Sequence, residues 1–240
     1  MAGFSPSSRG RLTSHDLGRF AGSTLFDRIG RAVCEAGCLP RKELYEAWEV
    51  ARRARRLFRG GRVVDVAGGH GLLAHVMLLL DDTSPNAVVI DPAPPASAPR
   101  LHDALVATWP RLKGRVEYRA EAIDAIALAP DDVVVSCHAC GALTDAIIEA
   151  AVAARARLAV LPCCHDEDTC DTGGLTGWMD VSLAIDAVRA VKLQACGYDV
   201  RTQAIPTGVT PKNRLIVASP SSSAPRTRHQ GPRTIIPSSR

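Results

Sequence analysis

Aromatic residues are scarce in this chain, and long apolar segments are missing. Phe, Trp and Tyr make up 4% of the 240 residues, so Ala, Val and Leu must build the interior. No apolar run reaches the roughly 20 residues that a membrane helix needs, and the best candidate, residues 72–80, contains a histidine. The N-terminus lacks the apolar segment of a signal peptide. These absences predict a cytoplasmic protein with no membrane partner.

Cysteine is present in moderate number and charge is nearly balanced. The eight cysteines are expected to be thiols, metal ligands or catalytic groups, because reducing compartments disfavour disulfides. The formal net charge is +4, which permits a nucleic-acid partner without requiring one. The hydrophobic share of 46% suits one domain with a full core. None of these features predicts an oligomeric state.

Composition divides the chain into four parts. Residues 1–13 are rich in Ser, Gly and Arg and are predicted to be disordered. Residues 14–59 have a helical pattern and form an N-terminal extension. Residues 60–219 form the main domain, and residues 220–240 are too poor in apolar residues to fold.

Strands and helices alternate from residue 60 onward. Strands are expected at 62–67, 86–91, 115–121, 131–137, 157–164, 198–206 and 213–220. Helices are expected at 72–80, 98–110, 142–156 and 178–197. This alternation predicts an α/β fold with a mostly parallel, seven-stranded sheet and helices on both faces.

The first candidate site follows the first expected strand, in the stretch VVDVAGGHG. Its turn contains Gly68, Gly69 and Gly71. Glycine lets the backbone approach a ligand closely. Asp65 lies near the end of the first strand, and Asp91 ends the second. An acid at the second position can accept hydrogen bonds from both hydroxyls of a ribose. The pattern therefore predicts a nucleoside cofactor at the carboxyl edge, the alternative being an ordinary strand–helix turn.

The same stretch resembles motif I of class I methyltransferases that use S-adenosylmethionine (SAM). D-x-A-G-G-H-G (65–71) is close to the usual (D/E)-x-G-x-G-x-G, whereas dinucleotide-binding folds need a further glycine. The resemblance implies a Rossmann-like fold with SAM as cofactor, Asp65 at its methionine end and Asp91 on its ribose. It also implies that Glu121 lies near the adenine, the alternative being a surface carboxylate. Ala67 replaces the first glycine, which is tolerable if its φ is negative.

The fourth and fifth expected strands are each followed by cysteine and histidine. The residues are Cys137, His138 and Cys140 after the fourth strand, and Cys163, Cys164 and His165 after the fifth. Because neighbouring parallel strands end at one edge, the two groups should face each other. Zinc binding is one hypothesis. However, successive strand residues point to opposite faces, so Cys163 and Cys164 should not join one site, and no bound metal is predicted. A cysteine nucleophile is a second hypothesis, although the Pro-Cys motif of cytosine-5 RNA methyltransferases is absent.

A third hypothesis comes from resemblance. H-A-C-G-A-L-T-D (138–145) and P-C-C-H (162–165) resemble a methyltransferase subgroup that includes eukaryotic tRNA 2′-O-methyltransferases. This resemblance implies an RNA substrate, a hydroxyl acceptor, and Cys137 among the cofactor-binding residues. It implies catalytic roles for His138, Cys140 and His165. The alternatives without catalysis are that His138 is a buried histidine that orients the loop and that Cys140 is a packed thiol. The chain departs from the subgroup in having one histidine after the Cys pair and no N-terminal Cys/His finger.

Basic residues supply candidate phosphate contacts for an RNA partner. They are Arg52, Arg53 and Arg56 on the last expected helix of the extension, and Lys212 and Arg214 before the final strand. Solvated surface charge is the alternative for the three arginines of the helix. Arg189 and Lys192, on the long helix, are expected to be solvated. Two other functions stay open: a catalytically degenerate RNA-binding or regulatory module, and a small-molecule methyltransferase.

Overall fold

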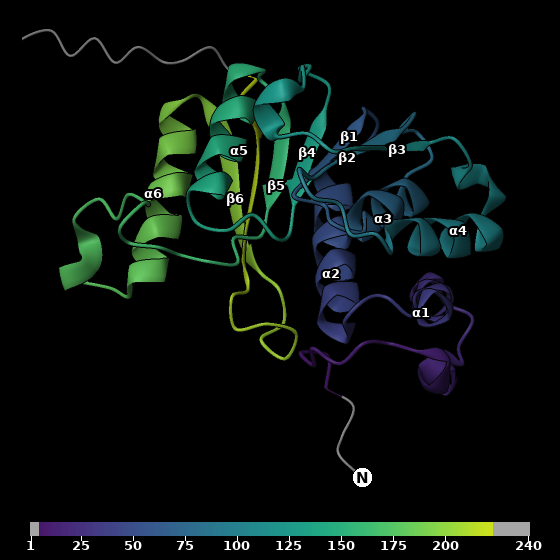
Figure 1. Cartoon of the computed structure of the whole chain (residues 1–240). Helices are drawn as coiled ribbons and strands as arrows, with labels where there is room; N and C mark the ends of the chain where they lie inside the picture. The colour runs from purple at the N-terminus through teal and green to yellow at the C-terminus, as the bar shows by residue number, and fades with distance from the viewer. Residues whose placement is uncertain (1–4, 223–240) are drawn as a thin grey trace, which may run out of the picture.

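Seven strands form a single sheet in the computed structural model, which describes residues 5–222 (Figure 1). The strands are β1 (Val63–Val66), β2 (Ala87–Ile90), β3 (Val116–Arg119), β4 (Val133–Ser136), β5 (Arg157–Val160), β6 (Tyr198–Ala204) and β7 (Arg214–Pro220). Their spatial order is β3-β2-β1-β4-β5-β7-β6. The first five run parallel, and β7 is antiparallel to both β5 and β6. The predicted fold class is confirmed.

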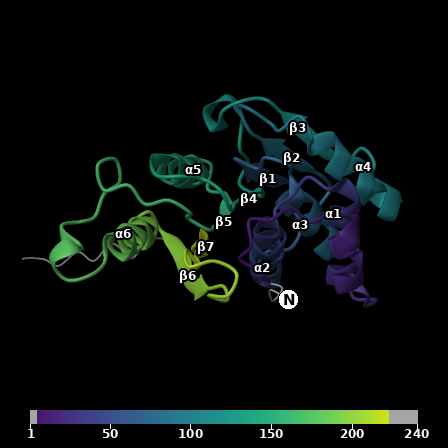
Figure 2. The same ribbon diagram turned by 60° about the horizontal axis from the view of Figure 1, so that its bottom comes forward.

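Within residues 5–222, six α-helices pack on the two sides of the sheet, with α1 in an outer position against α4 (Figure 2). They are α1 (Leu25–Ala36), α2 (Arg41–Leu57), α3 (Leu72–Leu80), α4 (Ala98–Thr108), α5 (Ala142–Ala153) and α6 (Val181–Ala195). Short 3₁₀ segments span Ser14–Phe20, Pro110–Leu112, Ile123–Ala125 and Leu175–Gly177. Helices α1 to α4 contribute to one apolar core, and α5 and α6 contribute to the other. In the described part of the chain, no helix combines the length and the apolarity needed to span a membrane.

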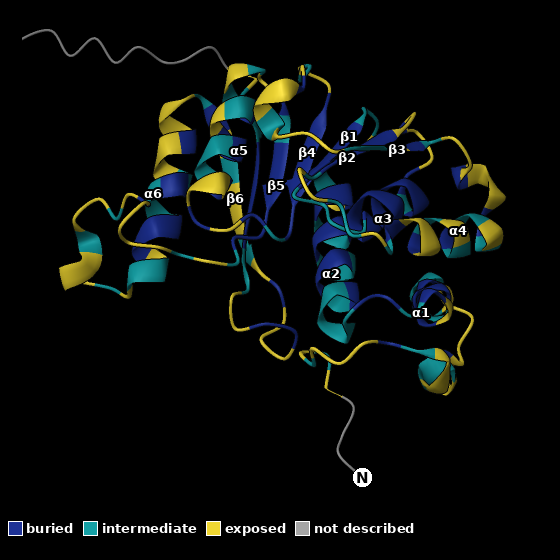
Figure 3. Cartoon of the chain, viewed as in Figure 1, coloured by how far each residue is buried: buried dark blue, intermediate teal, exposed yellow. Residues whose placement is uncertain are grey.

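The central strands are buried on both faces, which explains their continuous apolar sequence (Figure 3). In β1, Val63 belongs to the core under α2 and α3, whereas Val64 and Val66 belong to the core under α5. Burying one such side chain stabilises the fold by about 1.5–3 kcal/mol. Because successive side chains of a strand point to opposite faces, one sheet packs against the N-terminal helices on one face and the C-terminal helices on the other.

Residues 5–13 make specific contacts with the rest of the chain, although the sequence predicted disorder over residues 1–13. Leu12 is fully buried, and its N–H donates to the carbonyl of Leu39 at 2.9 Å. The N–H of Arg41 donates to the carbonyl of Gly10 at 3.0 Å. Leu12, an apolar residue in a polar stretch, thus packs in the core beside the connection between α1 and α2. The predicted tail lies outside the described residues from position 223 onward.

A buried ion pair fixes α2 against the segment that follows α3. Nη1 of Arg55 lies 3.2 Å from Oδ2 of Asp81, and both side chains are 3% exposed. Arg55 also donates from Nε to the Met77 carbonyl at 3.1 Å and from Nη2 to Oγ of Ser84 at 2.8 Å. An unpaired charge in this position would cost several kcal/mol. The pair therefore holds α2 in one position relative to the sheet.

The turn between β1 and α3 contains a non-glycine residue in the left-handed region. Ala67 has φ of +53°, so the negative φ that would make alanine free of strain at this position is not adopted. Gly69 and Gly71 follow with φ of +51° and +74°. A left-handed conformation costs an L-residue about 1–2 kcal/mol. The turn bends sharply enough after the strand that Ala67 cannot avoid this cost.

Replacing Ala67 with glycine should therefore leave stability unchanged or raise it by up to about 1 kcal/mol. Relief of the left-handed conformation offsets the larger entropy of glycine in the unfolded chain. A matched Ala150→Gly change in the middle of α5 should lower stability by about 1 kcal/mol. Urea unfolding of both variants measures the difference, and an equal loss in the two would contradict the strain at Ala67.

Candidate functional site

A cavity of about 300 Å³ opens at the carboxyl edge of the sheet, where β1, β2 and β4 end. Its polar or glycine lining comprises Glu43, Asp65, Gly68, Gly69, His70, Asp91, Cys137 and His138. Its apolar lining comprises Leu39, Ala47, Ala67, Leu72, Leu73 and Pro95. We call this cavity the carboxyl-edge pocket. It brings together Gly68 and Gly69 of the glycine turn, the acid after the second strand and the first residues after the fourth, whereas Gly71 does not line it.

Asp65 is a buried carboxyl at the bottom of this site. Its side chain is 1% exposed as part of β1, and its Oδ2 accepts a hydrogen bond from the N–H of Ala74 at 3.1 Å. Burial raises the pKa of Asp65 to about 7, and the charge of Asp91 adds to the shift. No cation in residues 5–222 forms an ion pair with it. A ligand with a positive group would therefore stabilise the ionised form of Asp65.

Asp91 shapes the glycine turn from the end of β2. Its Oδ2 accepts from the N–H of Gly69 at 3.0 Å, and its Oδ1 accepts from the N–H of Ala93 at 2.9 Å. A Cβ added at Gly69 would meet no atom within 4 Å, so the backbone faces open space there. Each carboxylate oxygen retains a lone pair. This arrangement leaves room for hydroxyl groups to donate to Asp91.

The N-terminal extension supplies a wall of the pocket through two residues that the sequence analysis did not single out. Glu43 and Ala47 on α2 both line the cavity. Burial, reinforced by repulsion from Glu46 and opposed by Lys42, raises the pKa of Glu43 to about 7. Glu43 precedes Ala47 and the buried Val50 by four and seven residues. An acid at helical spacing from apolar residues is the sequence signal that could have identified Glu43 as a residue facing the interior.

His138 lines the pocket directly after β4. Burial lowers its pKa below the usual value, an effect that the charge of Glu46 partly opposes and the charge of Lys42 reinforces. The imidazole is therefore neutral near pH 7 and able to accept a proton. The adjacent Cys137 is 4% exposed, and burial raises its pKa well above the usual range. A protonated thiol at Cys137 does not favour nucleophilic catalysis by this residue.

His165 does not line the pocket and belongs to a buried ionic network. Its Nε2 lies 2.8 Å from Oδ1 of Asp186. The carboxylate of Asp186 also accepts from Arg214 at 2.7 Å and from Arg189 at 3.4 Å. Arg189 makes two further bonds to Asp145, at 2.7 and 2.8 Å. Because Arg189 is 2% exposed, its expected solvation is wrong. An arginine on a helix gives no sequence signal for a distant acid that buries it.

Several predicted contacts lie away from the pocket. Glu121 is exposed and does not line it. Arg53 pairs with Glu49 on the same helix and donates to the carbonyl of Ala204 at 3.3 Å. Arg56 is exposed near the C-terminal end of α2, about 20 Å along the helix from its pocket-lining first turn. Sequence spacing could place these residues on helix faces but not relative to the site.

The remaining two basic candidates are placed differently. Arg52 is partly buried on α2. Lys212 is exposed on the connection between β6 and β7. It lies close enough to Cys140 and Cys164 to exert an electrostatic effect on both thiols. Lys212 is thus a predicted phosphate contact that lies near the cysteines following β4 and β5.

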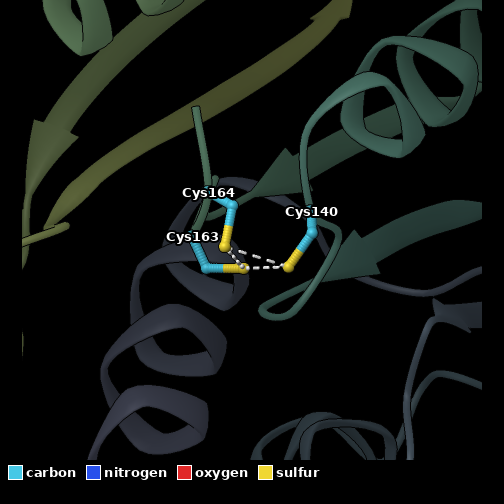
Figure 4. Close-up of side chains that lie close together, drawn as sticks. All are labelled: Cys140, Cys163 and Cys164. Carbon is cyan, nitrogen blue, oxygen red and sulfur yellow. Dashed lines mark hydrogen bonds between the residues drawn. The ribbon is translucent and has the colours of Figure 1, made fainter. Parts of the chain in front are cut away.

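Three thiols meet beside the pocket, which corrects the prediction that Cys163 and Cys164 point to opposite faces. Sγ of Cys140 lies 3.1 Å from Sγ of Cys163 and 3.2 Å from Sγ of Cys164 (Figure 4). The sulfur atoms of Cys163 and Cys164 are 3.8 Å apart. Strand β5 ends at Val160, four residues earlier than its apolar pattern suggests. The alternation of faces therefore no longer applies at Cys163 and Cys164.

Comparison with solved structures finds similar chains at low sequence identity. A candidate O-methyltransferase from Nostoc punctiforme PCC 73102 superposes with a TM-score of 0.50 and 15% identity, covering 85% of this chain and 67% of that one. An O-methyltransferase family protein from Burkholderia thailandensis has a TM-score of 0.47, 19% identity and coverages of 89% and 64%. A candidate RNA methyltransferase from Pyrococcus horikoshii has a TM-score of 0.48, 15% identity and coverages of 76% and 86%.

Two of these proteins are longer than the present chain, which spans about two thirds of their length. No curated protein matches the sequence significantly. A family model described as a methyltransferase domain matches residues 45–171, just over half of the chain. That match extends from α2, through the glycine turn and Asp91, to the three thiols after β4 and β5. The chain therefore belongs to this methyltransferase domain family.

Proposed function

We propose that the protein is a SAM-dependent methyltransferase that modifies a ribose hydroxyl of RNA. The observation that carries this proposal is the carboxyl-edge pocket, in which Asp65, Asp91 and His138 converge on the glycine turn. Carboxyl-edge sites of open α/β sheets are where such folds bind their ligands. Membership of the methyltransferase domain family supports the same activity.

The residues of the pocket fit the chemical groups of SAM. The buried carboxyl of Asp65, which forms no ion pair within residues 5–222, suits the positively charged methionine end. Asp91, which already holds the N–H of Gly69, suits the hydroxyls of the ribose. The apolar side chains of Leu72 and Leu73 line the same cavity. The acids and the apolar wall together favour a cationic nucleoside over a dinucleotide pyrophosphate, which would be repelled by two carboxylates.

His138 is the residue that we propose as general base. SAM, when bound, supplies an electrophilic methyl group on a sulfonium centre. An acceptor hydroxyl must lose its proton as its oxygen gains the methyl, and the neutral imidazole of His138 can accept that proton. By the subgroup resemblance, residues 138–141 stand where amino-group methyltransferases have an Asn/Asp-Pro-Pro-Tyr segment, and this chain has H-A-C-G there. A hydroxyl acceptor therefore agrees better with this pocket than a flipped base amine does.

RNA is the substrate class that we propose, because of the chain's positive charge and the subgroup resemblance of its two Cys/His motifs. The formal net charge is +4. Lys212 is exposed beside the residues that follow β4 and β5, and Arg56 offers an exposed charge farther along α2. Arg214, by contrast, is engaged by Asp186. Lys212 is therefore the stronger candidate for a phosphate contact near the site.

Incubation with SAM carrying a labelled methyl group and with separate RNA, protein and metabolite fractions tests the proposed substrate. Label should enter RNA and should persist in alkali-resistant dinucleotides, because a methylated 2′-oxygen cannot attack the neighbouring phosphate. A Lys212→Ala variant should need more RNA for half-maximal rate and should depend less steeply on salt. Label confined to protein or to small molecules would contradict the RNA proposal, and no label in any fraction would favour a degenerate binding module.

Replacing His138 with alanine should lower kcat by about 100-fold or more while leaving SAM affinity near that of the wild type. Because burial lowers the pKa of His138, wild-type kcat should fall only as pH drops below the usual histidine range, and the variant should lose this acidic limb. Since Asp65 titrates near pH 7, kcat must be measured at saturating SAM, with affinity followed separately.

His15, which is exposed on the first 3₁₀ segment, offers a matched control. A His15→Ala variant should keep the wild-type rate and pH profile. If the pH profile of kcat in the His138 variant kept the same fall at acidic pH as the wild type, His138 would not be the base, even if kcat were reduced.

A further inference from the structure

We propose that Cys140, Cys163 and Cys164 form a zinc site with three thiolate ligands and one position open to solvent. These are the only three His, Cys, Asp or Glu residues in the described part of the chain whose ligand atoms all lie within 4.8 Å of one another. The site is distinct from the carboxyl-edge pocket, because none of the three cysteines lines that cavity. The inference does not depend on the proposed methyl transfer.

The mutual geometry of the sulfur atoms favours a shared ion over a disulfide. Each sulfur is within 3.8 Å of both of the others, whereas a disulfide would draw two sulfurs together and leave the third aside. Tetrahedral Zn–S bonds of about 2.3 Å place two sulfurs about 3.8 Å apart. The observed separations of 3.1, 3.2 and 3.8 Å need only small side-chain shifts to reach this value. The three sulfurs point toward one another from two separate segments (Figure 4).

The backbone holds the two segments in register before any ion binds. Cys140 and Cys164 form a parallel bridge, and the N–H of Gly141 donates to the carbonyl of Cys164 at 3.2 Å. Sγ of Cys163 is 3.6 Å from the carbonyl oxygen of Ala139. Such preorganisation lowers the ordering cost of binding a metal. An ion here would link the segment after β4 to the segment after β5.

The charge and softness of the donors favour zinc. Three thiolates and one Zn²⁺ ion carry a net charge of −1, and Lys212 exerts an attractive effect on Cys140 and Cys164 in their charged forms. Thiolate ligands select zinc or copper(I) over magnesium or calcium. Cys140 and Cys164 are exposed, so water can occupy the fourth position. Binding would release three thiol protons and place one water on the ion, with no change of oxidation state.

Metal analysis of the full chain, purified under reducing conditions from cells supplied with zinc, tests the site. We expect about one zinc ion per chain. Replacement by Co²⁺ should give sulfur-to-cobalt charge-transfer absorption and visible bands of tetrahedral intensity, and X-ray absorption at the zinc edge should show three sulfur neighbours and one lighter one. These readouts use the wild-type protein and so do not depend on any variant folding.

Serine replacement identifies the ligands. Replacing a residue that only supports a metal ligand weakens metal binding by up to roughly 100-fold. We expect a larger loss of zinc affinity in each of three variants: Cys140→Ser, Cys163→Ser and Cys164→Ser. A Cys196→Ser variant, which removes an exposed thiol at the end of α6, should bind zinc as the wild type does. SAM binding by the zinc-free triple variant separates a failure of this site from a failure of the cofactor pocket.

Three results would overturn the proposal. Protein that contains no metal after purification from zinc-supplied cells would show that the three thiols bind no ion. Copper in place of zinc would show that the ion is assigned wrongly. A chain that is two hydrogens lighter, with a peptide linking two of the three cysteines, would show a disulfide instead. Full zinc content in the triple variant would place the metal elsewhere.

Discussion

Burial of the Asp65 carboxyl at the end of β1 is the constraint on which the rest of the site depends. The strand is covered on both faces, so an acid at its end leaves water almost completely, and its pKa rises to about 7. Among the described residues, its hydrogen-bond partner is the N–H of Ala74. A fold that keeps a poorly solvated carboxyl beside an open cavity is prepared for a cationic ligand, whose arrival would restore the ionised form.

The elements around Asp65 are arranged to keep that cavity open and bounded. The turn accepts a left-handed Ala67, and Asp91 fixes the same turn through Gly69. Helix α2, anchored by the buried Arg55–Asp81 pair, supplies the opposite wall. On the far side, the network centred on Asp186 joins α6 to β7 and reaches the residues after β5. These contacts therefore hold the segment of Cys140 next to the segment of Cys163 and Cys164.

Sequence pattern predicted the sheet, the glycine turn, Asp91 and the position of His138, because all of these follow from strand ends in a parallel fold. It failed where local backbone geometry or distant partners decide the outcome. The φ of Ala67 depends on how sharply the turn bends, and the meeting of Cys163 with Cys164 depends on where β5 ends. The burial of Arg189 depends on Asp145, 44 positions away, and Glu43 reaches the pocket only through the packing of α2. The exposure of Glu121 shows that family position alone does not place a side chain.

Calorimetric titration of the full chain with SAM tests the central claim most directly. The account predicts one binding event per chain, with affinity reduced by about 10- to 100-fold in Asp91→Ala, since hydrogen bonds to a charged group contribute about 1.5–3 kcal/mol. Asp103→Ala, which removes an exposed acid from α4, should bind as the wild type does. Absence of SAM binding by the wild type, or equal affinity in Asp91→Ala, would contradict the assignment of the carboxyl-edge pocket.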